Sequence, residues 1–538
     1  MSKSIYIINP RADFPSYFGA EVFAGRGLQR ATLIADLSIA TVAAFVPRDY
    51  QLEICDENLE PVDLETDAEV IAITGKISQA GRMKWLATEY RKRGKLVVIG
   101  GPFASLSPDR MRPHCDILVR GEVEEIAEPL FAHIREGNWK DEYVGTKPDL
   151  SLSPLPRWDL YANERAVMGC LQTSRGCPFE CEFCDVIQYL GRKQRHKSVP
   201  QVLAELDQLY ALGYRSVFLA DDNFTVFRSR AKELLIGLRD WNQRVAGGEM
   251  AFVTQASIDA ARDEELLEMC AQAGLRHCFI GIETPNEESL KETKKRQNVG
   301  VNLKDAFQRF YDHSITITGG MIVGFDSDDK DIFERQYRFA MDSGIPIFSI
   351  GALVAPQGTP LFDRLQTQSR LLGGDGTEMA GQAWSTNIVP ARMTQDELIG
   401  GLKWLCNRLY EPAAFAERVF QALDRIAVRD DGKACCQGMN REIDREQWTL
   451  LWKLADMGPQ EREMATTLNS RLLEKPGAAQ VVLGALFQYN QVRYVYESGR
   501  FWDPHLQEHG DPQEHGGPHE LAAVPAESEG SPFAVWKN

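Results

Sequence analysis

The chain has 538 residues, of which 43% are hydrophobic and 25% are charged, a composition typical of a folded protein with about three domains. The formal net charge of -17 argues against a nucleic-acid partner, because phosphate binding requires a basic face. The N-terminus carries no charged leader with a long apolar core, and no apolar run reaches the ~18 residues of a membrane span. These features predict a cytoplasmic protein without a membrane span.

Short apolar runs alternate with helical stretches over residues 1–145. The runs predicted as strands are Ile5–Ile8, Leu52–Asp56, Val70–Gly75, Leu96–Gly101 and Ile117–Gly121. Continuous apolar strands separated by helices indicate a parallel sheet that is covered on both faces. Ligands of such sheets bind beyond the carboxyl ends of the strands, so a site is expected in the loops that follow them. These loops begin at Asn9, Asp56, Gly75 and Gly100.

A second alternating series occupies residues 166–372, after a linker at 146–165 that is rich in Pro and Ser. Its predicted strands are Leu171–Ser174, Val217–Ala220, Phe252–Gln255, His277–Ile282, Gly320–Gly324 and Ile347–Gly351. Six strand–helix units with a polar residue or a glycine at each strand end are typical of a partial (β/α)6 barrel. Chemistry in barrels takes place at the carboxyl ends of the strands.

The pattern changes again after residue 372. Residues 373–500 contain five predicted helices, whereas residues 501–538 are rich in Pro, Gly, Glu and His and are predicted to form a disordered tail. The sequence therefore predicts an α/β protein with a Rossmann-like N-terminal domain, a partial barrel and an α-helical C-terminal domain.

Three cysteines, Cys177, Cys181 and Cys184, form a C-x3-C-x2-C run at the start of the predicted barrel. Thiolates are soft ligands that hold iron–sulfur clusters, and a four-iron cluster normally takes four of them. Three ligands in one loop leave the fourth iron open to a small molecule, as a catalyst requires. Zinc sites usually show a second cysteine pair or two histidines, which do not follow here, and a disulfide is not expected without an export signal.

The cysteine run resembles the signature of the radical S-adenosylmethionine (SAM) superfamily. The resemblance implies a 4Fe-4S cluster on Cys177, Cys181 and Cys184, with SAM chelated by the open iron and cleaved to a 5′-deoxyadenosyl radical. It also places Phe183, the aromatic residue before the last cysteine, near the adenine. The electron for cleavage is expected from an external reductant of the flavodoxin or ferredoxin type.

Two strand ends of the predicted barrel carry acidic residues that the resemblance assigns to SAM. Asp221 and Asp222 follow the second strand, where the family holds the SAM ammonium, and a carboxylate there accepts a charge-assisted hydrogen bond. The alternative is that Asp222 or Asn223 caps a helix. Glu283 follows the fourth strand and suits the ribose hydroxyls or the ammonium, because an unpaired buried carboxylate is costly.

The fifth barrel strand carries a further candidate contact to SAM. Gly320 and Ile322 lie in a glycine-rich run that resembles the stretch flanking the adenine, where only glycine permits close backbone approach. The basic run Lys294–Arg296 is a weaker candidate for the SAM carboxylate, since a solvated charge run is its ordinary interpretation. No residue is assigned a catalytic role from the sequence.

The N-terminal half is similar to the cobalamin-binding domain that precedes the radical SAM core in one large branch of the superfamily. Gly100 and Gly101 match a turn that lets the backbone approach the nucleotide tail of cobalamin, although two glycines also commonly end a strand. The D-x-H-x-x-G run that ligates cobalt in many cobalamin proteins is missing, since no histidine precedes His114. The resemblance therefore implies either cobalamin without a histidine ligand or a scaffold without the cofactor.

The resemblance covers most of residues 1–372 and extends more weakly into the helical region, which is similar to the C-terminal extension of hopanoid-methylase-type enzymes. It implies cobalamin-dependent methylation of an unactivated carbon in a small-molecule or lipid substrate. Two alternatives stay open. One is a radical SAM cyclisation, carbon–carbon coupling or oxidation without methyl transfer. The other is a non-catalytic iron–sulfur protein, which is disfavoured because electron carriers normally supply all four cluster ligands.

Overall fold

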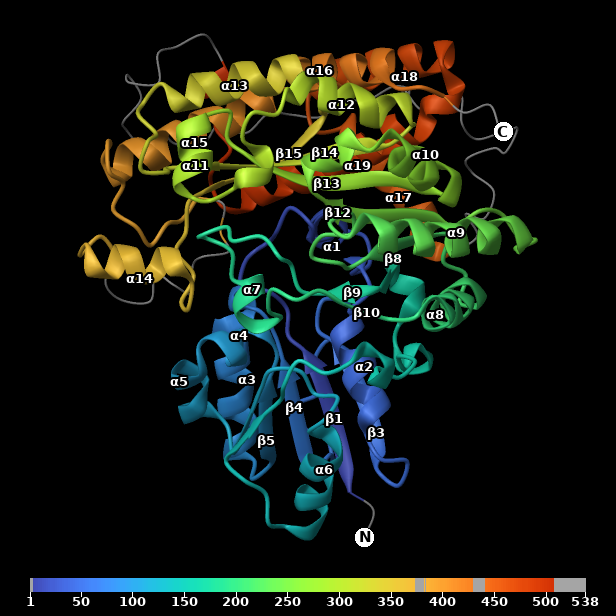
Figure 1. Ribbon diagram of the computed structural model, residues 1–538, viewed down its shortest axis with the longest axis vertical. Coiled ribbons are helices and arrows are strands. Elements are labelled where there is room, and N and C mark those ends of the chain that lie inside the picture. The colour runs from blue at the N-terminus through green and yellow to red at the C-terminus, as the bar shows by residue number, and fades with distance from the viewer. Residues whose placement is uncertain (1–2, 373–381, 383, 429–440, 508–538) are drawn as a thin grey trace.

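The computed structural model describes residues 3–372, 382, 384–428 and 441–507. Figure 1 shows two α/β halves, with the N-terminal sheet in the lower part of the view and the second sheet with the C-terminal helices in the upper part. The predicted α/β class with a helical C-terminal region is confirmed.

The N-terminal half contains a six-stranded parallel sheet in the order β3-β1-β4-β5-β6-β7. Its strands are β1 (Ser4–Asn9), β3 (Gln51–Asp56), β4 (Val70–Thr74), β5 (Leu96–Gly100), β6 (Ile117–Arg120) and β7 (Glu142–Val144). Its helices are α2 (Leu37–Phe45), α3 (Ala80–Lys92), α4 (Pro102–Leu106), α5 (Pro108–Met111) and α6 (Ala127–Glu136). The strand order changes direction between β1 and β4, the point at which ligands of such sheets bind.

Both faces of the N-terminal sheet are covered, as its continuous apolar strands predict. Side chains alternate along β1, so that Ile5 and Ile7 join the apolar core formed with α2 and α6. Tyr6 and Ile8 join a second core that contains α3. Figure 1 shows α3, α4 and α5 on one side of the sheet and α2 on the other.

The second sheet has seven parallel strands in the order β15-β14-β13-β12-β11-β8-β2. Its strands are β8 (Ala166–Leu171), β11 (Ser216–Leu219), β12 (Ala251–Ala256), β13 (Leu275–Glu283), β14 (Thr316–Val323), β15 (Ile347–Ala352) and β2 (Thr32–Ile34). The helices between them are α7 (Val186–Tyr189), α8 (Val199–Ala211), α9 (Arg228–Arg244), α10 (Glu264–Ala273), α11 (Glu287–Glu292), α12 (Leu303–Asp312) and α13 (Ile332–Ser343). Six of the strands form the expected partial barrel.

Two features of the second sheet differ from the sequence prediction. The seventh strand, β2, comes from the N-terminal part of the chain and pairs with β8, so that the two halves share a sheet. The first barrel strand ends at Leu171 and not at Ser174. Ser174 instead begins β9 (Ser174–Arg175), which pairs antiparallel with β10 (Arg195–His196) at the base of the cysteine loop.

The linker over residues 146–165 contains three short 3-10 turns, at Leu150–Leu152, Trp158–Leu160 and Asn163–Arg165. Trp158 is completely buried against the core, whereas Leu152 and Leu155 are exposed.

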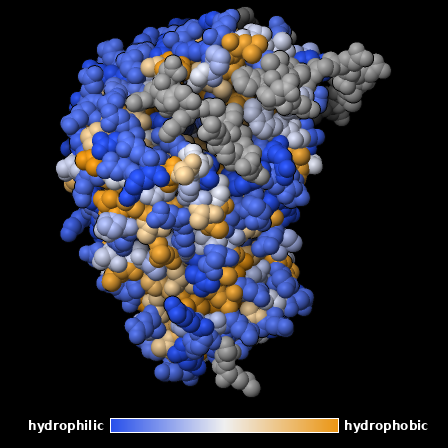
Figure 2. Space-filling model, turned by 90° about the vertical axis from the view of Figure 1, so that its right-hand side faces the viewer, coloured by the Kyte–Doolittle hydropathy of each residue, from blue (hydrophilic) through white to orange (hydrophobic). Residues whose placement is uncertain are grey.

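Figure 2 shows one side of the molecule, on which hydrophobic residues gather in the lower half and the top is mostly hydrophilic.

The C-terminal helices pack against the barrel. They are α14 (Pro360–Thr367), α15 (Gln395–Leu409), α16 (Pro412–Arg425), α17 (Glu442–Leu454), α18 (Pro459–Glu474) and α19 (Ala479–Ser498), with α1 (Glu21–Gly25) beside α19. One continuous apolar core joins the N-terminal sheet, the barrel and these helices. Within the described ranges, no helix combines the length and the apolar character that a membrane crossing needs.

The predicted start of the disordered tail is wrong for residues 501–507. Phe501 is buried and stacks on Trp384 with ring centroids 5.2 Å apart, and residues Pro504–Gln507 form a 3-10 turn. Asn407 of α15 donates to the Phe501 carbonyl (2.9 Å) and accepts from the backbone NH of Asp503 (2.7 Å). Residues 508–538, the rest of the predicted tail, lie outside the described residues.

Candidate functional site

The three cysteines lie in one loop, residues 176–194, that leaves β9 and returns at β10. Cys181 is buried and Cys177 and Cys184 are half-buried, and all three are free thiols. Burial raises the pKa of the Cys184 thiol to about 12, and Asp185 and the other two thiols contribute to the shift. The three thiols thus share one partly buried loop, as the cluster assignment requires.

The described residues hold no set of three His, Cys, Asp or Glu side chains placed to bind a single metal ion. A four-iron cluster has a different requirement, because each cysteine ligates a different iron. Three free thiols in one loop fit that requirement. A side-chain amide, Gln297 Nε2, also donates to Cys181 Sγ over 3.6 Å, and hydrogen bonds to the sulfurs are one way in which proteins tune clusters.

The cysteine loop is covered by α14, a contact that sequence reasoning missed. Glu182, between the second and third cysteines, is buried and accepts a hydrogen bond from Arg364 Nε (2.5 Å). Its carbonyl accepts from the backbone NH of Leu361 (3.1 Å), and its own NH donates to the Thr293 carbonyl (2.9 Å). The available signal was an acidic residue inside a cysteine run, which needs a partner when buried.

The two aspartates after β11 have different environments. Asp221 is fully buried and accepts four hydrogen bonds of 2.5–3.0 Å from the NH and hydroxyl groups of Thr173 and Ser174, which fills its acceptor capacity. Asp222 accepts one bond from the Gly176 NH (2.8 Å) and lines the cavity described below. Burial raises the pKa of Asp222 to about 6. Of the pair, Asp222 is therefore the residue available to a ligand.

The alternative assignment of Asp222 or Asn223 as a helix cap is wrong. The next helix, α9, begins at Arg228 and has Phe227 at its N-cap, without a side-chain hydrogen bond. Asn223 instead donates from Nδ2 to Ser257 Oγ over 2.5 Å.

Glu283 ends β13 in a left-handed backbone conformation, with φ of 65°, where the pairing with β14 shifts register. Its carboxylate forms an ion pair with Lys295 Nζ at 2.7 Å, with the side chains only 9% and 14% exposed. Burial lowers the pKa of Lys295, but the charges of Glu283 and Cys181 outweigh it and the net direction is upward. A Cβ atom on Gly281 would lie 2.4 Å from Glu283 Oε1, so glycine makes room for the pair.

Two of the three residues predicted near the adenine, Phe183 and Ile322, lie together. Phe183 and Ile322 pack on the same small apolar cluster, in which the Phe183 and Phe325 rings lie 6.1 Å apart between centroids. Gly320 is paired in register with Gly281 on the neighbouring strand. A Cβ atom on Gly320 would lie 2.9 Å from the Phe279 ring, so this glycine makes room for the Phe279 side chain.

A cavity of about 1010 Å³ lies between the carboxyl ends of the two sheets. The N-terminal half contributes Asn9, Asp56, Gly75, Gly100, Gly101 and Glu122, and the barrel half contributes Gln172, Arg175, Tyr189, Asp222 and Gln255. Among the described residues that line it, none is a histidine. Its inner wall is apolar and includes Ile5, Ile7, Val98, Val119 and Leu130. The cavity thus reaches from the loops predicted to hold cobalamin to Asp222, whereas the three cysteines of the loop, Glu283 and the residues predicted near the adenine are not among its lining residues.

The two glycines predicted at the cofactor both line this cavity. Gly101 has φ of 93° and ψ of -176°, a region open essentially to glycine alone, and a Cβ there would lie 2.6 Å from Thr74 Oγ1. Gly100 is different, because a Cβ atom there would lie 3.5 Å from Val119 Cβ, which is an ordinary van der Waals contact. The turn therefore requires glycine at position 101 for its own structure.

Asp56, at the carboxyl end of β3, is the most strongly perturbed acid on the N-terminal side of the cavity. Burial raises its pKa to about 6, and the charge of Asp36 contributes. Its carboxylate accepts hydrogen bonds from Tyr161 Oη (2.6 Å) and from the amide of Asn58 (2.7 Å). The side chain is thus part of a bonded network at the cavity wall.

Comparisons with known proteins match two family models to this chain. The radical SAM superfamily matches residues 171–340, and a domain of unknown function, DUF4070, matches residues 359–498. An uncharacterized methyltransferase of Synechocystis sp. is 37% identical over 411 residues, covering 74% of this chain and 75% of the relative. The hopanoid C-2 methylase of Rhodopseudomonas palustris is 30% identical over 408 residues, covering 74% and 76%.

The fold is also similar to that of a solved structure. The cobalamin-dependent SAM radical enzyme OxsB, with aqua-cobalamin and SAM bound, superposes with a TM-score of 0.58 at 15% identity, covering 93% of this chain and 80% of OxsB.

A parallel half-barrel with a three-cysteine loop at the carboxyl ends of its strands defines a class of enzymes that cleave SAM with an iron–sulfur cluster. This chain belongs to the radical SAM superfamily. The predicted enzyme class and its two cofactors, a 4Fe-4S cluster and SAM, are thereby confirmed.

Proposed function

We propose that this enzyme methylates an unactivated carbon of its substrate, with cobalamin as the methyl carrier and SAM as the source of both the methyl group and the radical. The observation that carries the proposal is the cavity between the two sheets. Its volume of about 1010 Å³ lies at the upper end of the range for ligand pockets, roughly 300–1,000 Å³. Its walls come from both halves, as a second large cofactor beside SAM requires. Two relatives named methyltransferase or methylase support the same reaction.

The N-terminal half is proposed to hold cobalamin. When bound, this cofactor supplies a cobalt centre that accepts and donates a methyl group. Gly100 and Gly101 would let its nucleotide tail approach the backbone after β5, and the apolar inner wall would exclude water. None of the described residues that line the cavity is a histidine, so these residues would hold cobalamin without offering an imidazole to its cobalt.

The barrel half is proposed to hold the cluster and SAM. Cys177, Cys181 and Cys184 would each ligate one iron and leave the fourth to SAM. The remaining contacts follow from charge and shape. Asp222 is assigned to the SAM ammonium, Glu283 to the ribose hydroxyls, Lys295 to the SAM carboxylate, and Phe183, Gly320 and Ile322 to the adenine.

We propose three functional units: residues 1–145 for cobalamin, residues 166–372 for SAM cleavage, and residues 373–500 as a helical cover, with residues 146–165 as the linker. The nine described cysteines are free thiols, which suits a reducing cytoplasm and an external one-electron reductant. The substrate is assigned only to the class of small molecules or lipids.

Anaerobic reconstitution with iron, sulfide and hydroxocobalamin, followed by desalting, tests this function. We expect about four irons and one cobalamin per chain. The control is the variant with Cys177, Cys181 and Cys184 changed to Ala, which should lose the iron and keep the cobalamin. Iron without cobalamin would move the assignment to cyclisation, coupling or oxidation, and a fully loaded cluster in the triple variant would contradict the ligand assignment.

A further inference from the structure

The cysteine loop is closed at its base by only two residue pairs, Arg195 opposite Arg175 and His196 opposite Ser174. This register places two guanidinium groups on directly opposed positions of a two-residue ladder. Like charges at such positions destabilise strand pairing. The base of the loop therefore requires negative charge from elsewhere in the molecule.

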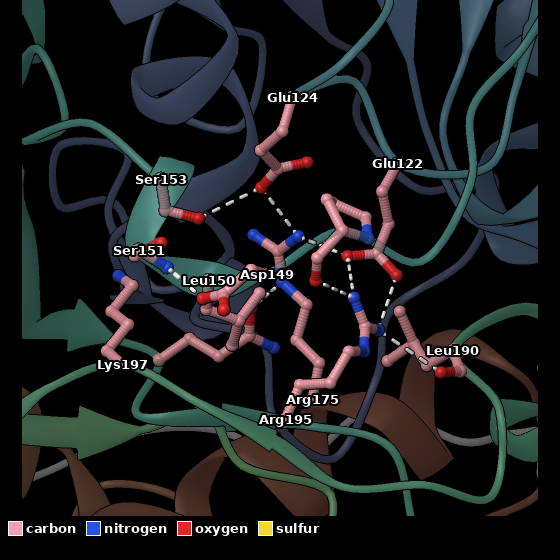
Figure 3. Close-up of polar contacts among 12 residues, drawn as sticks. Glu122, Glu124, Asp149, Leu150, Ser151, Ser153, Arg175, Leu190, Arg195 and Lys197 are labelled. Atoms are coloured by element: carbon pink, nitrogen blue, oxygen red, sulfur yellow. Dashed lines mark hydrogen bonds and ion pairs between the residues drawn. The ribbon is translucent and has the colours of Figure 1, made fainter.

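That charge comes from the N-terminal half, as Figure 3 shows. Glu122, just after β6, accepts from Arg175 Nη1 (2.6 Å) and from Arg195 Nη2 (2.5 Å). Glu124 accepts from Arg175 Nη1 (2.7 Å) and from the Ser153 hydroxyl (3.0 Å). Two carboxylates thus balance two guanidinium groups.

The four charges are largely removed from water. The side chains of Arg175 and Arg195 are 12% and 11% exposed, and those of Glu122 and Glu124 are 6% and 1% exposed. Breaking a buried pair by removing one partner is strongly destabilising, because the other charge is left without compensation. A neutral network at this depth is consequently sensitive to the loss of any one member.

The backbone fixes the position of Glu122. Gly121, directly before it, has φ of 74°, and a Cβ there would lie 2.5 Å from the Gly145 carbonyl oxygen. The NH of Gly145 in turn donates to the Arg120 carbonyl (2.7 Å). The carboxylate is therefore presented by two strand ends that are packed backbone against backbone.

The two arginines also form hydrogen bonds toward the cysteine loop and toward the strand end assigned to SAM. Arg195 also donates to the Leu190 carbonyl (3.2 Å), inside the cysteine loop. Arg175 Nε donates to Gln172 Oε1 (2.7 Å), and Gln172 Nε2 donates to the Ala220 carbonyl (3.1 Å), next to Asp221 and Asp222. The network thus links β6, the cysteine loop and the strand end assigned to SAM.

We propose that Glu122 and Glu124 are positioning residues for the iron–sulfur cluster. They neutralise the arginine pair at the base of the cysteine loop, so that docking of the N-terminal half sets the placement of the three cysteines and of the SAM site. This gives the N-terminal half a role in SAM binding that is separate from its proposed cofactor. The inference rests on the proposed assignment of Cys177, Cys181 and Cys184 as the cluster ligands.

The test uses Glu122→Gln, Arg195→Gln and the double variant in the full chain, reconstituted with iron and sulfide only. Iron content is measured first, followed by EPR of the reduced cluster during titration with SAM, without substrate or cobalamin. Glu122→Gln should lower the apparent affinity for SAM in this EPR titration about tenfold. The reason is that one carboxylate then faces two buried guanidinium groups. The double variant should return to within about threefold of wild type, because the remaining Arg175–Glu124 pair is neutral.

A matched control is Glu446→Gln, which breaks the ion pair with Arg165 (2.8 Å; side chains 15% and 10% exposed) before the opposite end of β8. It makes the same chemical change and should leave the EPR titration unchanged. Glu124→Gln is a milder second variant with an intermediate expected effect, because this carboxylate pairs with Arg175 and not with Arg195. Circular dichroism selects the variants that fold.

The outcomes separate this inference from the function proposed above. The positioning role of Glu122 is overturned if the cluster in Glu122→Gln responds to SAM as in wild type. It is also overturned if the double variant binds SAM as weakly as Glu122→Gln does. Wild-type protein that loads no cluster overturns the cysteine assignment together with this inference. Failure to bind cobalamin leaves the expected EPR results unchanged and concerns the methyl-transfer proposal alone.

Discussion

Glu283 shows at the scale of one residue how the SAM side of the site is built. Its left-handed backbone costs about 1–3 kcal/mol for a residue other than glycine, and such conformations cluster at functional sites. The conformation turns the carboxylate toward Lys295, in the space left by Gly281. Of the basic run considered from the sequence, Lys295 has a side chain that is only 14% exposed, whereas Lys294 and Arg296 are exposed.

Lys295→Met should weaken SAM binding about tenfold or more, because a hydrogen bond to a charged group contributes roughly 1.5–3 kcal/mol. Iron content should stay at the wild-type level, since no cluster ligand is changed. Anaerobic equilibrium dialysis with labelled SAM measures the affinity. Lys294→Met is the matched control and should bind SAM as wild type does, and equal affinity in both variants would remove Lys295 from the site.

Among the elements of the fold, the short turns at strand ends, and not the helices between the strands, form the site. The turn from β5 to α4 holds Gly101 in a conformation that other residues avoid, directly at the cavity wall. The ladder between β9 and β10 has only two residue pairs, and the whole cysteine loop lies between these two strands. Both are too small to give a periodic sequence signal.

Gly101→Ala should lower the cobalamin content of the reconstituted protein well below one per chain. A side chain at this φ and ψ costs about 1–3 kcal/mol, and its Cβ would also press on Thr74 Oγ1 and move the cavity wall. Gly137→Ala is the control, because Gly137 also has a positive φ (74°) but has open space around its Cβ position. Equal cobalamin content in the two variants would exclude the β5–α4 turn from the site.

At the scale of the whole molecule, the barrel and the C-terminal helices share one core and also a polar contact around His277. Nδ1 of this histidine contacts Thr316 Oγ1 (2.7 Å), and Nε2 contacts Thr318 Oγ1 (3.0 Å). The Thr318 hydroxyl continues to Gln488 of α19 at 3.3 Å. Burial lowers the pKa of His277 to about 4, so the neutral ring is the native form.

Acidification should therefore destabilise the protein through His277. The unfolded chain binds this proton near pH 6.5 and the folded chain only near pH 4, so the stabilisation is complete above pH 6.5 and is lost as the pH falls toward 4. Between pH 7.5 and pH 5.5 the loss amounts to about 1–2 kcal/mol. The Tm of His277→Gln should fall less over this interval than that of wild type.

Scanning fluorimetry at both pH values makes this comparison, with His133→Gln on α6 as the control variant. A wild-type Tm that falls no more than that of His277→Gln would contradict a depressed pKa at His277.

Much of the architecture could be predicted, because a run of apolar residues is a local pattern. The strands near residues 5, 52, 70, 96 and 117, and the later barrel strands, were found for this reason. The three-residue strand β2 and the helix α14 were not, since β2 is held by its pairing with β8 and α14 by its contacts with the cysteine loop. Phe501 likewise follows a helix in a polar context, and only its partner Trp384 makes it part of the core.

The sequence by itself determined the superfamily and the candidate cluster ligands, because three closely spaced cysteines are a local pattern that specifies its own chemistry. Only the tertiary structure decided that Asp222 and not Asp221 is open to a ligand, and that Lys295 and not Lys294 meets Glu283. It also brought Glu122 to Arg175 and Arg195 across more than fifty residues of chain. Such choices depend on which groups are desolvated together, and burial is a property of the packed molecule that no short segment carries.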